Sequence, residues 1–162
     1  MEIQCTLRRT FAILQLRKGV VIMVETYHNV VVAVDFSEKA KIAFERGVRI
    51  AKLTGATLHL VCVIDTHSFG SVEAYDLKYA KELKEKAAVH LDEYKKIAVE
   101  AGVENIRTIV EEGSPKVILT SLTESDLIIV GATGLNRAER FLLGSVSENV
   151  VRNAKCDVLV VR

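Results

Sequence analysis

The sequence contains no tryptophan, one proline and three cysteines among its 162 residues. Cys5, Cys62 and Cys156 lie far apart and form no C-x-x-C pair, which argues against a disulfide framework or a structural zinc site. Cys62 and Cys156 lie inside apolar runs, so we predict that both are small buried hydrophobic residues rather than catalytic thiols. No apolar run reaches the length of about 18 residues that a membrane-spanning helix needs. We expect a cytoplasmic protein with no membrane partner.

An excess of charge of either sign is also absent. The 22 Lys and Arg residues offset the 21 Asp and Glu residues, and the net charge is +1. Such a chain has no long-range field that would attract nucleic acid or an anionic membrane. The four histidines have no metal-ligand spacing to Asp, Glu or Cys. We therefore expect no nucleic-acid partner and no metal bound directly by side chains.

Residues 1–22 lie outside the pattern of the rest of the chain. They combine basic and apolar residues but contain no uninterrupted apolar region or small-residue cleavage site of the kind found in signal peptides. We predict an N-terminal extension over residues 1–22, which is flexible or reflects a start codon assigned too early, and one domain over residues 23–162. A short basic amphipathic helix over residues 5–17 is the alternative. The extension should be dispensable for folding and ligand binding.

From residue 29 onward, apolar β-branched runs alternate with segments of helical periodicity. The runs predict buried strands over residues 29–35, 56–64, 103–111, 126–130 and 156–161. The third run is the least apolar and is typical of a sheet edge. Helices are predicted from the N-cap Ser37 to Gly55 and over residues 72–101, 113–123 and 146–154. Right-handed crossovers then predict a single α/β domain with an open parallel sheet and helices on both faces.

In such a sheet, ligands bind beyond the carboxyl ends of the strands. The fourth predicted strand is followed by Gly131, Gly134 and then, after nine further residues, Gly144 and Ser145. Glycine permits a close approach of the backbone to a ligand, and Ser145 with Glu148 forms the S-x-x-E pattern of a capping box. The N–H groups at the start of the following helix would then bind phosphate. Hydroxyl donors to the same phosphate are predicted at Thr133, Ser145 and Ser147.

The same residues have simpler interpretations. The glycines could only shape a long loop, and Asp35, which follows the first strand, could only cap the next turn. Arg137 and Arg140 lie in the glycine loop and could either contact phosphate or remain solvated. Other phosphate motifs are absent, since no glycine precedes a lysine as in a Walker A loop, and Thr133 stands at the second glycine of a G-x-G-x-x-G pattern.

The segment from Gly131 to Arg162 resembles the carboxyl-terminal signature of the universal stress proteins, in particular of their ATP-binding branch. Its pattern, G-x2-G-x9-G-[ST], is matched by Gly131, Gly134, Gly144 and Ser145. VVVAVDFSEKA at residues 30–40 and LHLVCVID at residues 58–65 resemble the first two strands of the family. The resemblance covers about residues 23–162. It implies a Rossmann-like sheet of five strands in the order 3-2-1-4-5, similar to that of the adenine nucleotide alpha hydrolases.

The resemblance also implies a role for each matching position. Asp35, with its two preceding residues, would face adenosine, and Val63 would hold adenine through its backbone. The phosphates, with Mg²⁺ or Mn²⁺ bound to them, would lie against the glycine loop and the helix that follows it. Thr133 stands where many members have histidine, which leaves a hydroxyl for the same contact. The complete predicted ATP site is Ala33, Val34, Asp35, Val63, Val130, Gly131, Thr133, Gly134, Gly144, Ser145, Val146 and Ser147.

Three functions remain open at this point. The first is an ATP-binding regulatory protein of the stress response, or a nucleotide-dependent switch. The second is a slow ATPase or another adenine-nucleotide enzyme, although no evident general base lies near the glycine loop. The third is a nucleotide-free dimeric interaction module, which typically lacks the glycine–serine pattern. In the implied strand order CDVLVVR is an edge strand, and its pairing with a second copy would give a homodimer.

Overall fold

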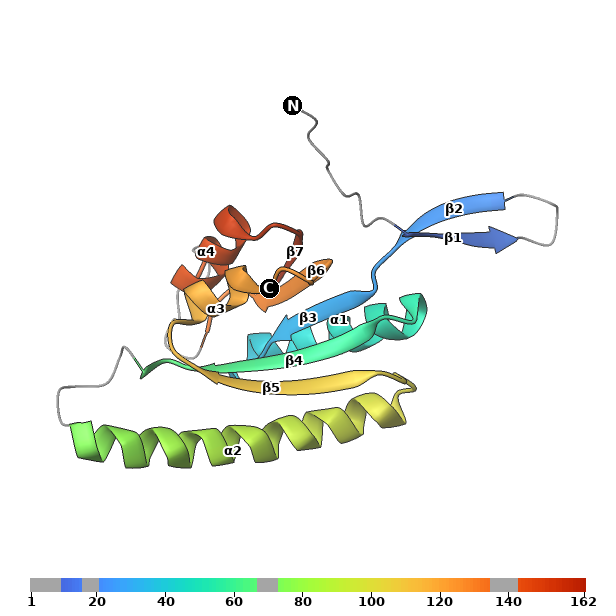
Figure 1. Ribbon diagram of the computed structural model, residues 1–162. Helices are drawn as coiled ribbons and strands as arrows, with labels where there is room; N and C mark the ends of the chain where they lie inside the picture. The colour runs from blue at the N-terminus through green and yellow to red at the C-terminus, as the bar shows by residue number, and fades with distance from the viewer. Residues whose placement is uncertain (1–9, 16–20, 67–72, 135–142) are drawn as a thin grey trace.

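The computed structural model describes residues 10–15, 21–66, 73–134 and 143–162, and Figure 1 shows how its elements are arranged. From residue 29 onward every predicted strand and helix is present, with ends shifted by at most a few residues. The elements in chain order are β1 (Thr10–Gln15), β2 (Val21–Thr26), β3 (Asn29–Ala33), α1 (Glu38–Thr54), β4 (Thr57–Ile64), α2 (Glu73–Glu100), β5 (Ile106–Glu112), α3 (Pro115–Ser121), β6 (Leu127–Gly131), α4 (Ser145–Asn153) and β7 (Asp157–Val161).

The five strands from β3 onward form one parallel sheet in the order β5-β4-β3-β6-β7. Counted from β3, this is the order 3-2-1-4-5, so the predicted fold is confirmed. β3 pairs with β4 on one side and with β6 on the other. The chain therefore adds strands first on one side of β3 and then on the other. The crevice between the carboxyl ends of β3 and β6 is where sheets of this kind bind ligands.

The central strands are mostly apolar because both faces of the sheet are covered. Val30 and Val32 of β3 and Ile129 of β6 are fully buried on the face covered by α1 and α2. Val31 and Val130 are buried on the opposite face, beneath α3 and α4. Figure 1 shows α2 along one side of the sheet and α3 with α4 on the other. The prediction of helices on both faces is confirmed.

The helix α1 begins and ends as the sequence predicts. The Ser37 hydroxyl accepts a hydrogen bond from the Ala40 N–H at 3.2 Å, and Gly55 ends the helix with a left-handed φ of 70°. In the middle of the helix, Gly47 faces β3, where an added Cβ would overlap the Val32 side chain. Glycine at this position therefore lets α1 lie close against the sheet.

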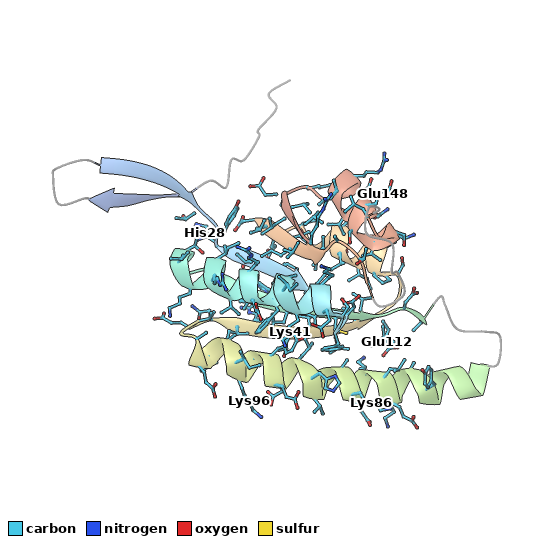
Figure 2. The ribbon with its side chains drawn as sticks, turned by 180° about the vertical axis from the view of Figure 1, so that it is seen from behind. His28, Lys41, Lys86, Lys96, Glu112 and Glu148 are labelled. Atoms are coloured by element: carbon cyan, nitrogen blue, oxygen red, sulfur yellow. The ribbon has the colours of Figure 1, made fainter. Side chains whose placement is uncertain are left out.

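The long helix α2 has one buried and one solvated side. Ala87 and Leu91 are buried against the sheet. Figure 2 shows Lys86 and Lys96 on the side of α2 that faces away from the sheet, and Lys96 forms an exposed ion pair with Asp92 at 3.1 Å. Among the described residues, no helix combines the length and the apolar character needed to cross a membrane.

The two edges of the sheet are β5 and β7. The prediction that the third parallel strand lies at an edge is therefore confirmed. Val158, Leu159 and Val160 of β7 are only half-buried. The expectation of burial is correct for Cys62 but wrong for Cys156, which is partly exposed because it lies in the bend between α4 and β7 rather than within the strand.

The N-terminal strands β1 and β2 form a separate antiparallel hairpin in which Thr10 lies opposite Thr26 and Gln15 opposite Val21. Figure 1 shows this hairpin beyond the start of β3, apart from the five-stranded sheet. The helix considered for residues 5–17 is wrong where the structure describes that segment, because Thr10–Gln15 form an extended strand that pairs with β2. That residues 1–22 are dispensable stays a prediction.

Candidate functional site

The carboxyl ends of β3, β4 and β6 surround a cavity of about 340 Å³, a size typical of small-molecule sites. All of the predicted ATP-site residues line this one cavity. They are Ala33, Val34, Asp35, Val63, Val130, Gly131, Thr133, Gly134, Gly144, Ser145, Val146 and Ser147. The structure therefore brings together segments that lie up to about a hundred residues apart in the sequence, as the topology of the sheet requires.

Sequence reasoning missed five further lining residues: Ala40, Val61, Asp65, Pro115 and Leu119. Asp65 directly follows β4 and Asp35 lies two residues after the end of β3, and parallel strands end at the same edge of a sheet. That repeated position was a signal that could have identified Asp65. The apolar residues carried no such signal, because they reach the cavity only through the packing of α1 and α3.

Asp35 lies in the turn that connects β3 to α1. Its Oδ1 atom accepts hydrogen bonds from the Ser37 N–H at 3.1 Å and from the Ser37 hydroxyl at 2.6 Å. The capping interpretation of Asp35 is therefore correct for one carboxylate oxygen. Oδ2 is directed toward the glycine loop, since a Cβ added at Gly134 would lie 2.6 Å from it. Within the described residues Oδ2 accepts no hydrogen bond, so it is available to a ligand.

The two ends of the glycine loop are held together by hydrogen bonds. The Gly144 N–H donates to the Ala132 carbonyl at 2.7 Å, and the Ser147 hydroxyl donates to the Gly131 carbonyl at 2.6 Å. Ser147 is 5% exposed. Because its one hydroxyl proton is used inside the protein, the expectation that this hydroxyl donates to phosphate is wrong for this structure. Arg137 and Arg140, for which phosphate contacts were considered, lie outside the described residues.

The helix α4 begins one residue earlier than the capping-box pattern predicts. Its N-cap is Gly144 with ψ of 152°, Ser145 is the first helical residue, and no side chain caps the helix. The predicted box is therefore wrong. The Glu148 carboxylate instead accepts from Arg152 at 3.1 Å, on the exposed surface of α4 labelled in Figure 2.

The N-terminus of α4 consequently presents free donors. The first hydrogen bond within the helix runs from the Glu148 N–H to the Gly144 carbonyl. The N–H groups of Ser145, Val146 and Ser147 precede it, so they have no acceptor within the helix. These three residues line the cavity. Together with the positive end of the helix dipole, they form an arrangement that favours an anion.

The structural requirement for glycine differs between positions of the loop. A Cβ at Gly131 would lie 2.9 Å from Lys39 Cβ and 3.1 Å from the Lys39 carbonyl carbon. Gly131 therefore approaches the start of α1 closely, and its contact with a ligand, which the sequence suggested, stays a prediction. A Cβ at Gly144 would meet no atom of the described residues closer than 3.5 Å. Packing against the described part of the chain therefore does not require glycine at this position.

Val63 reaches the cavity because β4 extends beyond β3. The pairing of the two strands ends with Ala33 opposite Val61. The Thr57 N–H donates to His28 and the Val61 carbonyl accepts from Val34, so the odd-numbered residues of β4 direct their backbone groups toward β3. Val63 directs its N–H and C=O to the same side, where β3 has already ended. Its backbone therefore offers one donor and one acceptor to the cavity.

The electrostatics of the cavity are uneven. Among the described lining residues the charged side chains are both acidic, namely Asp35 and Asp65, and both lie at the ends of β3 and β4. Positive potential comes from the N-terminus of α4, whose first three residues also line the cavity. In the part of the chain that the structure describes, no cluster of three or more His, Cys, Asp or Glu residues is placed to hold a metal ion.

The thiol of Cys62 is buried in the core on the face of the sheet that α1 and α2 cover, and it is not among the residues that line the cavity. Burial, with a smaller contribution from the negative charge of Asp35, raises the pKa of Cys62 to about 11. The thiol is therefore protonated at neutral pH and is a poor nucleophile. This agrees with the prediction that Cys62 is a structural residue.

The fold and the cavity define an open parallel α/β protein that offers its ligand site at the point where the strand order reverses. Comparison with known proteins gives the family. The chain belongs to the universal stress protein family, whose family model matches residues 26–162. The family predicted from the glycine–serine pattern is confirmed.

Individual relatives agree with this assignment. A universal stress protein sequence from Staphylococcus aureus strain USA300 is 47% identical over 141 residues, which cover 85% of each chain. The structure of universal stress protein UspA from Lactobacillus plantarum matches 85% of this chain and 99% of its own, with 29% identity and a TM-score of 0.80. A universal stress protein solved in complex with cAMP is 29% identical, with a TM-score of 0.64, over 85% of this chain and 98% of that one.

Proposed function

We propose that this protein binds ATP together with a divalent cation and acts as a nucleotide-dependent regulator in the stress response. The observation that carries the proposal is the N-terminus of α4, which has no side-chain cap, directly follows the glycine loop and lines the cavity. A regulator needs only that its bound and free states differ, so we assign binding, rather than rapid turnover, as the function.

The adenosine half of ATP fits the end of the cavity formed by β3 and β4. An adenine edge carries a hydrogen-bond donor beside an acceptor, which matches the N–H and C=O of Val63. The Asp35 Oδ2 atom can accept from ribose hydroxyls, because Oδ1 is already held by Ser37. Asp65 also lines the cavity. Carboxylates there favour a hydroxyl-bearing sugar and repel a phosphate.

The triphosphate fits the opposite end of the cavity. The positive end of α4 lies there, with the backbone N–H groups of Ser145, Val146 and Ser147 as donors to the phosphates. The hydroxyls of Ser145 and Thr133 make no hydrogen bond within the described residues, and both residues line the cavity. They can donate to phosphate oxygens, whereas the Ser147 hydroxyl holds the loop closed.

A divalent cation fits this donor set because the described lining contains no lysine or arginine to offset the charge of a triphosphate. Mg²⁺ and Mn²⁺ prefer oxygen ligands, and such ions are often held mainly through substrate phosphates. When bound, the cation would neutralise the phosphates and lower their repulsion from Asp35 and Asp65. The residues of this chain would orient the nucleotide rather than coordinate the metal as a cluster.

The relatives support an adenine nucleotide as the ligand class. One related universal stress protein, 29% identical, is described in complex with cAMP. ATP is also an adenine nucleotide but has a longer phosphate chain. The three free N–H groups of α4 and the hydroxyls of Ser145 and Thr133 provide hydrogen-bond donors for that chain.

Calorimetric titration of the full chain with ATP, ADP and adenosine, each with and without Mg²⁺, tests the proposal. We expect affinity to fall in the order ATP, ADP, adenosine, and a chelator to weaken ATP most. The small molecule that the purified protein retains after denaturation should be an adenine nucleotide. Equal affinity for ATP and for GTP titrated under the same conditions would contradict the proposal. The absence of binding to ATP, ADP and adenosine would contradict it as well.

We predict that Asp35→Ala weakens adenosine and ATP by a similar factor, about tenfold to a hundredfold. The variant removes the acceptor for the ribose and releases the turn that Oδ1 holds, and a hydrogen bond to a charged group contributes about 1.5–3 kcal/mol. Inorganic tripolyphosphate with Mg²⁺ should bind at the unchanged phosphate end. Calorimetry measures the affinity of the variant for adenosine, ATP and tripolyphosphate. If the affinity for tripolyphosphate fell by the same factor as that for adenosine, the assignment of Asp35 to the nucleoside would be refuted.

We also propose that the protein is a homodimer formed by antiparallel pairing of β7 with its symmetry mate. The Asp157 N–H and the Val161 carbonyl bond toward β6, so Val158 and Val160 direct their backbone groups outward from the edge. An uncovered apolar edge favours pairing with another strand.

We predict that the native chain sediments as a dimer at micromolar concentration and that Val160→Pro sediments as a monomer. Proline removes an outward N–H but no bond to β6, so the circular dichroism spectrum should be retained. Leu159→Ala, which removes no backbone donor, is the control. A native chain that remains monomeric, or a dimer that survives Val160→Pro, would argue against the interface.

A further inference from the structure

The turn next to the cavity contains a strained residue. Phe36, between Asp35 and Ser37, has a φ of 60°, and it is the only residue other than glycine with positive φ among those that the structure describes. A bulky side chain rarely adopts this left-handed conformation, and such outliers persist only where surrounding contacts hold them. No such strain is needed to start α1, since many helices follow a serine N-cap without it.

The contacts that hold Phe36 come from α2. Its ring meets His90 edge-on with a centroid separation of 4.9 Å and meets Tyr94 edge-on at 6.0 Å. Tyr94 is in turn stacked on the buried Phe44 of α1 at 4.5 Å. These separations and angles are those of favourable aromatic pairs. The four rings therefore join the turn, α1 and α2 into one cluster.

Phe36 itself does not line the cavity, so the cluster can influence a ligand only through Asp35. The orientation of the adjacent Asp35 carboxylate depends on the conformation of Phe36. Both hydrogen bonds that the carboxylate accepts come from Ser37, and Phe36 connects the two residues in the chain. If Phe36 relaxed to an extended conformation, the Ser37 N–H and hydroxyl would move away from Oδ1. The Oδ2 atom would then lose its fixed direction toward Gly134.

We propose that Tyr94 is a positioning residue of the nucleoside site: with His90 it keeps Phe36 in its left-handed conformation and thereby aims the Asp35 carboxylate into the cavity. This inference rests on the proposed function, in which Asp35 binds the nucleoside half of ATP. It makes α2, which follows β4 in the chain and contributes none of the described lining residues, a determinant of adenosine affinity.

The charge environment of Tyr94 is consistent with this placement. Burial raises the pKa of Tyr94, and the negative charges of Glu38, Asp35 and Glu45 raise it further. The phenol therefore stays neutral near neutral pH and acts through its ring. Tyr94→Phe keeps the ring and should preserve the positioning, whereas Tyr94→Ala removes the ring that contacts both Phe36 and Phe44.

Separate titrations with adenosine and with inorganic tripolyphosphate plus Mg²⁺ test the inference. Tyr94→Ala should weaken adenosine about tenfold and leave tripolyphosphate within twofold of the native chain, while Tyr94→Phe should restore native adenosine affinity. Ile97→Ala, on the exposed surface of the same helix, is the matched control and should change neither. Phe36→Gly, whose backbone adopts φ of 60° without strain but has no ring to be held, should also weaken adenosine selectively.

The outcomes separate this inference from the proposed function. If the native chain binds neither compound, the proposed function fails. If the native chain binds adenosine and Tyr94→Ala binds it with unchanged affinity, the positioning role is wrong and the proposed function stands. If Tyr94→Ala weakens both compounds equally, the ring acts only on general stability, which also overturns the inference.

Discussion

Gly144→Val should reduce the affinity for ATP more than a hundredfold while the protein remains folded. Gly144 has a φ of −63°, which any residue adopts without strain, and an added Cβ would lie 3.5 Å from the nearest protein atoms. Those atoms are the Ala132 carbonyl and Thr133 Cα, so the new side chain would fill the space between the glycine loop and the start of α4. A phosphate needs that space to reach the N–H groups of the helix.

A graded series checks this expectation by calorimetry and thermal melting. Gly144→Ala should weaken ATP less than Gly144→Val, because the smaller side chain blocks less of the space. Ser145→Ala removes one hydroxyl and no helix cap, so a loss of about 1 kcal/mol, or roughly fivefold in affinity, is expected. Melting temperatures of all three variants should stay close to that of the native chain. Unchanged ATP affinity in Gly144→Val would mean that phosphate does not bind at α4.

The fold was predictable because every strand from β3 onward has a distinct pattern. A parallel strand buried on both faces requires an unbroken apolar run, and NVVVA and LIIVG satisfy that requirement without ambiguity. The end of α1 carries a glycine in the left-handed conformation that glycine favours. The lining of the cavity followed from the same topology, since the carboxyl ends of β3, β4 and β6 must meet at one edge of the sheet.

The finer geometry of the site depended on tertiary contacts that no local pattern encodes. Ser145 and Glu148 have the spacing of a capping box, but the helix starts at Ser145 because Gly144 is held by the Ala132 carbonyl. The sequence suggested that the Ser147 hydroxyl donates to a ligand, but it donates its hydrogen bond to the carbonyl of Gly131, sixteen residues earlier.

The hairpin β1–β2 escaped prediction for a related reason. Its two strands are short, lie outside the alternating pattern and are joined by no turn motif that the sequence analysis recognised. Asp65 was missed although it directly follows β4, at the edge of the sheet where Asp35 follows β3.

At Gly131 the glycine pattern has two interpretations that an experiment can distinguish, a contact with the ligand and a requirement of packing. Its motif position suggests a ligand contact, whereas its surroundings require glycine for packing. A Cβ there would lie 2.9 Å from Lys39 Cβ, 3.1 Å from the Lys39 carbonyl carbon and 3.2 Å from the Ala40 nitrogen. Two of these atoms belong to the backbone of α1, whose position is fixed by Gly47 against β3 and by the Ser37 cap. The helix therefore cannot move aside without loss of other contacts.

Gly131→Ala should accordingly lower the free energy of unfolding by about 2 kcal/mol, within the range for overpacked cores, and lower the melting temperature by roughly 4–8 °C. Gly144→Ala, which adds the same methyl group where the protein has room, should melt within a degree or two of the native chain. The molecules of Gly131→Ala that remain folded should bind ATP within about threefold of native affinity, because the added methyl meets α1 and not the phosphates. Chemical denaturation with calorimetry on the same samples measures both quantities. A variant with native stability but no ATP affinity would reverse the assignment and make Gly131 a ligand-contacting residue.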